Sequence, residues 1–335
     1  MGIDLPLIWI IIIAFGVMMY VVMDGFDLGI GILLPFVRDR GDRDTMINTV
    51  APVWDGNETW LVLGGAALMA AFPLAYSVLL SALYLPLVLM LAGLIWRGVA
   101  FEFRFKAHDP HKSFWDQAFS WGSYIATFSQ GVCLGAFING FKVTGPSYMG
   151  GALDWLTPFS LFTGVGLVVA YALLGSTWLI MKTEGTLQRR MIALARPVTY
   201  ALLAVIGIVS LWTPLAHPAV AARWFTLPNL FFFSPVPLLV IATTWVILNA
   251  LKRETHAAPF LLTLFLMLMG YSGLAISLWP NIIPPGVSIR EAAGPPESMG
   301  FTLVGALFII PIILTYTAWS YFVFRGKAKA GEGYH

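Results

Sequence analysis

Long apolar segments recur along almost the whole chain, and they constrain its fold more than any other feature. A helix needs about 20 mostly apolar residues to cross the hydrocarbon core of a bilayer. Nine segments meet that length or approach it: residues 7–37, 52–72, 75–103, 114–140, 158–181, 195–216, 235–251, 258–280 and 300–324. The second and seventh are short, so length alone leaves a count of eight open. We expect an all-α polytopic membrane protein with nine transmembrane helices.

The composition supports this class and excludes others. Of the 335 residues, 59% are hydrophobic and only 11% are charged, whereas soluble domains usually carry about 25% charged residues. A net charge of +2 gives no electrostatic basis for binding nucleic acid. The single cysteine, Cys133, excludes an internal disulfide and a cysteine-based metal site. We expect one integral membrane domain over residues 1–335, ending in a polar tail at 326–335.

The basic residues predict the orientation of the chain. When the loops are assigned alternately to two sides, 16 of the 19 Lys and Arg residues fall on one side. The other side receives Lys142, Arg223 and Arg290. Cytoplasmic loops carry the excess of Lys and Arg, so the N-terminus is expected outside and the C-terminus in the cytoplasm. Removing the second or seventh segment would send later basic loops to the wrong face, which favours nine.

The first apolar segment contains two acidic residues where a membrane helix normally has none. In VVMDGFDLGIGILLPF, residues 21–36, Asp24 and Asp27 are three apart and therefore share one helix face. A charged residue at the centre of a span costs about 2.5–3.5 kcal/mol. Gly25 and Gly29 form a small-xxx-small face that lets another helix approach closely. We therefore expect both acids to face protein rather than lipid.

A second polar group opens the next apolar segment, in APVWDGNETW at residues 51–60. Asp55 and Glu58 are again three apart, near a helix start whose free N–H groups and dipole favour carboxylates. A simple capping role for Asp55 is one interpretation. The segment also holds more polar and aromatic residues than a cap requires: Trp54, Asn57 and Trp60. We therefore favour a functional role for the group.

Arg97 is the basic residue placed deepest in the third segment. It lies about two helical turns inside Arg104 and Lys106. It can pair with a carboxylate of the first two segments, or extend its side chain to the lipid head groups. We favour pairing, because buried acids need a partner.

The fourth segment adds polar residues of less specific meaning. Asp116 and Gln117 lie near its start and are candidate caps. Gln130 and Asn139 lie deeper, where interhelical hydrogen bonds are more common than ligand contacts.

The histidines argue against a heme ligand in this chain. A heme in a membrane bundle usually takes axial His or Met ligands from its helices. The five histidines instead fall in loops, at segment ends or in the tail: His108, His111, His217, His256 and His335. Methionine is more often a filler of the core than a ligand. We predict neither a heme ligand nor a metal site.

These residues alone predict carboxylates and an arginine gathered near the inner half of a helical bundle. Such groups are typical of a proton path or an ion-coupled site. They do not distinguish a respiratory subunit from an ion-coupled secondary transporter, nor from a structural scaffold for a catalytic partner. A channel is disfavoured, because no ring of repeated polar motifs appears.

Two longer motifs carry a resemblance to a known family. MDGFDLGIGILLPF, followed by INTVAPVWDGNETWLVLGGAALMAAFPLAY, resembles subunit II of the cytochrome bd-type quinol oxidases, most strongly over residues 20–106. The short length and the outer loops resemble the cyanide-insensitive branch. The resemblance implies two four-helix bundles plus one peripheral helix in the bacterial inner membrane. It also implies a complex that oxidises quinol and reduces dioxygen to water.

The same resemblance implies cofactors and partners. Two b-type hemes and a heme d, or its b-type equivalent, are expected on the heme-bearing subunit I, and none on this chain. A bound quinone occurs in some members. The implied partners are subunit I, a small accessory subunit, membrane lipids and quinol.

The resemblance also implies roles for individual residues. Asp27 and Asp55 match acids that contribute to proton delivery, with Asp24 and Glu58 in the same path. Arg97 matches an arginine of the family's third span, and we group Asn57 with it as a supporting residue. Trp60 matches an aromatic residue near an oxygen route at the subunit interface, and Trp54 is grouped with it. Our hypothesis is that Asp55 loads protons from the cytoplasm and that Asp27 and Asp24 carry them inward through ordered water.

Overall fold

The chain forms a bundle of long helices. The computed structural model describes residues 3–328, so residues 329–335 of the expected tail lie outside the described part. The helices are α1 (Leu5–Leu33), η1 (Leu34–Phe36), α2 (Arg40–Asn48), α3 (Trp54–Ala71), α4 (Pro73–Lys106), α5 (Asp109–Asn139), α6 (Pro158–Lys182), α7 (Gly185–Ala216), α8 (Pro218–Phe225), α9 (Asn229–Phe233), α10 (Pro235–Lys252), α11 (Ala258–Leu278) and α12 (Pro296–Val323). Two short hairpins pair β1 (Val143–Thr144) with β2 (Ser147–Tyr148) and β3 (Asn281–Ile283) with β4 (Val287–Ser288).

The prediction of many membrane helices is confirmed in its coarser form. Within the described residues, seven helices are long and apolar enough to cross a membrane: α1, α4, α6, α7, α10, α11 and α12. Helices α3 and α5, of 18 and 31 residues, correspond to the second and fourth predicted segments but are not among the seven. In α3 the polar first turns lower the mean hydropathy.

Several helices extend beyond the predicted apolar segments. The largest difference is in α7, which begins at Gly185 instead of 195. The residues at its start are polar, including Arg189 and Arg190, so a search for apolar runs misses this helical extension. It reaches beyond the apolar part of the bundle.

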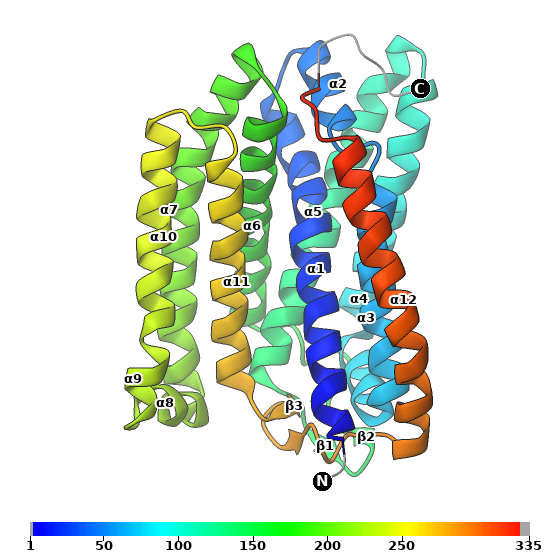
Figure 1. The fold of residues 1–335 in the computed structure, drawn as a ribbon, viewed down its shortest axis with the longest axis vertical. Helices are drawn as coiled ribbons and strands as arrows, with labels where there is room; N and C mark the ends of the chain where they lie inside the picture. The colour runs from blue at the N-terminus through cyan, green and yellow to red at the C-terminus, as the bar shows by residue number, and fades with distance from the viewer. Residues whose placement is uncertain (1–2, 329–335) are drawn as a thin grey trace.

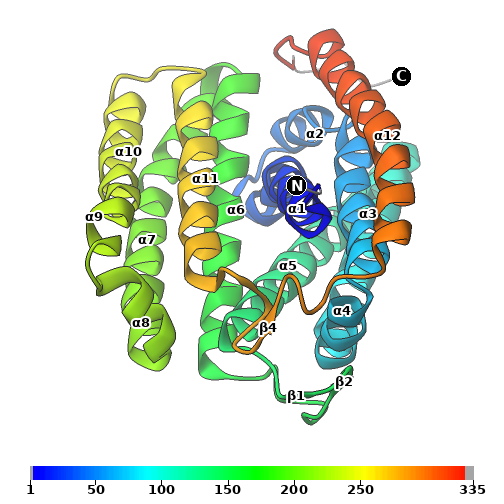
Figure 2. The ribbon, with the colours of Figure 1, turned by 60° about the horizontal axis from the view of Figure 1, so that its bottom comes forward.

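The long helices stand side by side, and the connections gather at two ends (Figure 1). The α2 end carries α2 and the described end of the chain after α12. The opposite end, which we call the hairpin end, carries the start of α1, both hairpins, α8 and α9. Figure 2 shows α1 among α3, α5 and α6, with α7 and α10 on one side of the molecule and α12 on the other.

The second half of α1 is enclosed by protein. Every residue from Met23 to Leu34 is buried, which confirms that the acids of this segment do not face lipid. Glycine permits the close packing on α6, because a Cβ at Gly29 would collide with the backbone of Tyr171 and a Cβ at Gly175 would lie 2.5 Å from the Gly29 carbonyl carbon. On the same side, Phe26 stacks on Trp178 with ring centroids 4.2 Å apart.

Helix α12 lies at the edge of the bundle. Among its residues only Met299 is fully buried, and the Met299 carbonyl accepts a hydrogen bond from the Trp9 indole on α1. At its other end the Lys182 ammonium donates to the carbonyls of Phe324 and Gly326. The last helix is therefore held mainly at its two ends.

Candidate functional site

Arg97 of α4 is fully buried and joins two carboxylates from two other helices. Its Nη2 lies 2.5 Å from Oδ1 of Asp24 on α1 and 2.6 Å from Oε1 of Glu58 on α3. Asp24 is also fully buried, whereas the Glu58 side chain is 29% exposed. The predicted pairing of Arg97 is confirmed, and the predicted extension toward head groups is not what the structure shows.

Asp27 lies in the same region with a different partner. Its Oδ2 accepts a hydrogen bond of 2.7 Å from Nδ2 of Asn57 on α3. The Asn57 Oδ1 in turn accepts one of 2.8 Å from the hydroxyl of Tyr321 on α12. We call Asp24, Asp27, Asn57, Glu58 and Arg97 the central cluster. It is assembled from α1, α3 and α4, and α12 touches it through one hydroxyl.

Several buried polar atoms of the central cluster have no hydrogen-bond partner among the described residues. They are Oδ2 of Asp24, Oδ1 of Asp27, and Nε and Nη1 of Arg97. Buried polar atoms are nearly always paired, either with protein or with ordered water. This cluster therefore has unused hydrogen-bonding capacity on both its acidic and its basic members.

Asp55 lies apart from the central cluster, at the start of α3. Its side chain is exposed. The capping interpretation is wrong, because Val53 is the residue before the helix and no side-chain cap is formed. Asp55 still acts electrostatically on Glu58, one turn further along α3.

The two tryptophans of α3 have different surroundings. The Trp54 ring lies 5.6 Å from the Arg97 guanidinium carbon, a cation–π contact. Trp60 is fully buried and meets the ring of Phe15 edge to face at 5.7 Å. Trp54 therefore supports the central cluster, while Trp60 packs against the first half of α1.

Sequence reasoning missed the tyrosines that surround the central cluster. Tyr20 and Tyr171 are buried, and both are joined to Gln130 of α5 by hydrogen bonds of 2.7 and 2.9 Å. The interhelical hydrogen bond predicted for Gln130 is confirmed. A signal for Tyr20 was present, since it precedes Asp24 by four residues and so shares its helix face. No local signal points to Tyr171 or Tyr321.

A second group of ion pairs lies at the α2 end. The Asp116 carboxylate binds Nε of Arg104 at 2.5 Å and Nη1 of Arg43 at 3.0 Å, and Asp44 binds Arg104 at 2.8 Å. We call Arg43, Asp44, Arg104 and Asp116 the end cluster. The prediction that Asp116 caps its helix is wrong, because it lies about two turns past the start of α5 and binds two arginines.

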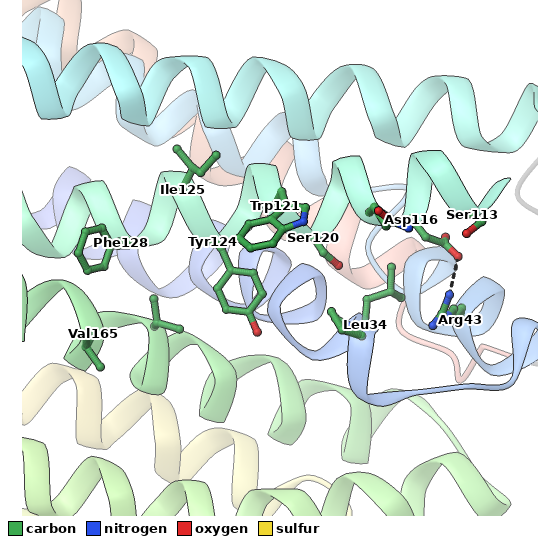
Figure 3. Close-up of a pocket in the computed structure, with 13 residues that line it drawn as sticks. Leu34, Arg43, Ser113, Asp116, Ser120, Trp121, Tyr124, Ile125, Phe128 and Val165 are labelled. Carbon is green, nitrogen blue, oxygen red and sulfur yellow. Dashed lines mark hydrogen bonds and ion pairs between the residues drawn. The ribbon is translucent and has the colours of Figure 1, made fainter. Parts of the chain in front are cut away.

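A groove of about 850 Å³ begins at the end cluster and follows α5 and α6. Figure 3 shows Arg43, Ser113 and Asp116 at one end and Ile125, Phe128 and Val165 at the other. The lining is therefore polar at one end and apolar at the other. This arrangement suits an elongated amphipathic molecule.

The residues that the structure describes contain no group of three or more His, Cys, Asp or Glu side chains placed to hold a metal ion. Together, the fold and the central cluster define a multi-pass membrane protein with ionisable side chains buried between its helices.

Comparison with known proteins identifies the family. The model of the family "Cytochrome bd terminal oxidase subunit II" matches residues 5–324. The cytochrome bd-I ubiquinol oxidase subunit 2 of Escherichia coli (strain K12) is 27% identical, over 96% of this chain and 95% of its own length. The cytochrome bd ubiquinol oxidase subunit 2 of Bacillus subtilis (strain 168) is 28% identical, over 97% of both chains. The chain therefore belongs to the subunit II family of the cytochrome bd terminal oxidases.

The fold agrees with this family. A chain of the bd oxidase from Geobacillus thermodenitrificans superposes with a TM-score of 0.77 at 15% identity, over 96% of this chain and 99% of that chain. The protein is a subunit of a quinol:oxygen oxidoreductase complex that contains hemes and a partner subunit I. The alternative of a secondary transporter is not supported by these matches.

Proposed function

We propose that this subunit delivers protons from the α2 end of the bundle to the oxygen-reducing reaction of its partner. The observation that carries the proposal is the composition of the central cluster. Among the described residues it sets Asp24, Asp27 and Glu58 against one cation, Arg97. Uncompensated buried charge costs several kcal/mol per ion, so the cluster is expected to hold at least one proton and to exchange it.

The proposed proton route runs from exposed carboxylates to buried ones. Asp55 is exposed, the Glu58 side chain is 29% exposed, and Asp24 and Asp27 are fully buried. In this scheme Asp55 takes protons from the water phase and Glu58 passes them to the buried pair. Ordered water bound at the unpaired oxygens of Asp24 and Asp27 connects the carboxylates.

Arg97 and Asn57 position the acids and are not proposed to transfer protons. The guanidinium stays protonated in proteins, so it stabilises the ionised form of whichever carboxylate has released its proton. Asn57 fixes the Asp27 carboxylate through its amide N–H. Trp54 supports Arg97 from one face.

We assign the hemes of the complex, two of b type and one heme d or its b-type equivalent, to subunit I. In this chain the described histidines lie at helix ends or in connections: His108, His111, His217 and His256. None comes from the middle of a helix, where axial ligands are usually found. The hemes supply the electron transfer and dioxygen chemistry, and the residues of this chain supply protons.

We propose nine membrane crossings, with α3 and α5 added to the seven apolar helices. Their lengths of 18 and 31 residues and their position among the other long helices support this count (Figure 2). The excess of Lys and Arg at the α2 end favours a cytoplasmic location of that end and a periplasmic N-terminus, in the bacterial inner membrane. Residues 1–335 then form one membrane domain of two four-helix bundles, with α12 as the peripheral helix.

We propose two further roles for parts of this chain. We propose the groove beside the end cluster as the place of a bound quinone, because its polar end and apolar wall match a head group and an isoprenoid tail. We also propose that Trp60 and Trp54 lie along an oxygen route that leads to the interface with subunit I.

One substitution distinguishes proton delivery from the alternative that this subunit is only a structural scaffold. Asp55→Asn keeps the size of the side chain but cannot carry a proton. We expect the variant complex to assemble with its full heme absorption and to consume oxygen more slowly. Full turnover in an assembled Asp55→Asn complex contradicts a loading role for this residue, and loss of the assembled complex supports the scaffold.

A further inference from the structure

A row of uncharged polar side chains leaves the central cluster toward α5 and α6. Nε2 of Gln130 donates a hydrogen bond of 2.7 Å to the hydroxyl of Tyr20, and the Tyr171 hydroxyl donates one of 2.9 Å to Oε1 of Gln130. Tyr20 is 5% exposed and Tyr171 is fully buried. The row therefore connects α1, α5 and α6 inside the bundle.

Tyr20 links this row to Asp24. The two residues are four apart on α1 and so lie on the same helix face. Oδ2 of Asp24 is buried without a hydrogen-bond partner among the described residues, and the two side chains interact electrostatically. The oxygen of Tyr20 already accepts a hydrogen bond from Gln130. Its own O–H is therefore the donor that is left for the carboxylate of Asp24.

Gln130 determines what the row can transmit. Its amide donates on one side and accepts on the other, which fixes the order of donors along the row. A primary amide has no ionisable proton near neutral pH, so it holds its neighbours in place without passing a proton between them. The row can orient Asp24, but it cannot continue a proton path toward α6.

We propose that Tyr20, held by Gln130 and Tyr171, is a positioning residue. Its O–H is directed at the unpaired oxygen of Asp24 and so orients that carboxyl group toward Arg97, and the row closes the proton path on the α5–α6 side. This inference rests on the proposed role of Asp24 in proton delivery. It adds Tyr20 to the residues that take part in proton delivery. It also states where the proton path ends, on the α5–α6 side of Asp24.

Other groups also act on Asp24 and enter any pH dependence. They come from every helix that packs around it: Asp27 on α1, Glu58 on α3, Arg97 on α4, Tyr171 on α6 and Tyr321 on α12. None of them is altered by Tyr20→Phe, which removes only one hydroxyl group. The variant therefore isolates the contribution of the row.

The experiment measures oxygen consumption by the assembled complex as a function of pH. We expect Tyr20→Phe to assemble with unchanged heme absorption. Losing a hydrogen bond to a carboxylate favours its protonated form, so the pH at half-maximal turnover should move upward by about half to one unit. An unchanged pH profile in an assembled Tyr20→Phe complex overturns the inference.

Two further variants provide a matched control and a second test of the inference. Tyr271→Phe is the matched control, because its hydroxyl donates to the Ala14 carbonyl of α1 and not to a carboxylate; its profile should equal that of the unaltered complex. Gln130→Leu frees the Tyr20 hydroxyl and should give a smaller shift in the same direction. If Tyr20→Phe fails to assemble, a Gln130→Leu complex with an unchanged profile overturns the inference.

Asp24→Asn separates this inference from the proposed function. If that variant assembles and keeps full turnover, proton delivery through Asp24 is contradicted. If it loses turnover while Tyr20→Phe keeps the unaltered pH profile, only the positioning role is contradicted.

Discussion

The central cluster and the end cluster each take one arginine from α4, yet they balance their charges differently. Arg97 and Arg104 are seven residues apart on α4, which is about two helical turns. Among the described residues, Arg97 meets an excess of carboxylates, whereas Arg104 and Arg43 meet Asp44 and Asp116 in equal number.

This difference separates a functional ion cluster from a structural one. In the end cluster each ionised group has a partner of opposite charge, so a change of protonation only weakens it. In the central cluster the acids outnumber the cation, and Oδ2 of Asp24 and Oδ1 of Asp27 remain without a protein partner. We expect substitutions in the central cluster to change turnover, and substitutions in the end cluster to change stability.

The largest effect is expected from Arg97→Met. It leaves Asp24 and Glu58 without their cation, and removing one member of a buried ion pair typically costs about 3–5 kcal/mol. We expect little assembled complex, measured by heme absorption after purification in detergent. Arg43→Met is the control, because its side chain is 22% exposed and should cost much less. Equal yields for the two variants would break the distinction between the clusters.

The next effect is expected from Glu58→Gln. The amide keeps the size of the side chain and its contact with Arg97, so the complex should assemble. Oxygen consumption per complex should fall by about tenfold or more, because the partly exposed member of the acid row can no longer carry a proton. Turnover at the level of the unaltered complex would show that protons reach Asp24 by another route.

A smaller and different effect is expected from Asp116→Asn. The substitution removes the anion shared by Arg43 and Arg104 and should lower the stability of the complex by about 1–3 kcal/mol. Thermal unfolding of the purified complex measures this loss. Turnover per assembled complex and its pH profile should not change, and a shifted pH profile would make the end cluster part of the proton path.

The smallest effect is expected from Tyr321→Phe. It removes one hydrogen bond to Asn57, with a cost of about 1 kcal/mol. A small decrease in the thermal midpoint should accompany turnover reduced by less than the effect of Glu58→Gln. If turnover falls further than in Glu58→Gln, α12 has a direct part in proton transfer.

The sequence predicted the helical membrane class and the burial of Asp24, Asp27 and Arg97. These predictions succeed because burying charge in a membrane is costly, and this cost restricts where acids and an arginine can lie. The pairing of Asp24 rather than Asp27 with Arg97, and the partners of Asp116, were not predictable. They depend on the rotation of helices about their axes, which spacing along one helix does not determine.

The hydrogen bond between Tyr321 and Asn57 joins residues that are 264 positions apart. During synthesis Asn57 emerges 264 residues before Tyr321. The Asn57 oxygen therefore lacks its Tyr321 donor until α12 packs at the edge of the bundle. Formation of this hydrogen bond consequently requires α12 to have packed against α3, so it couples the first acidic helices to a segment inserted much later.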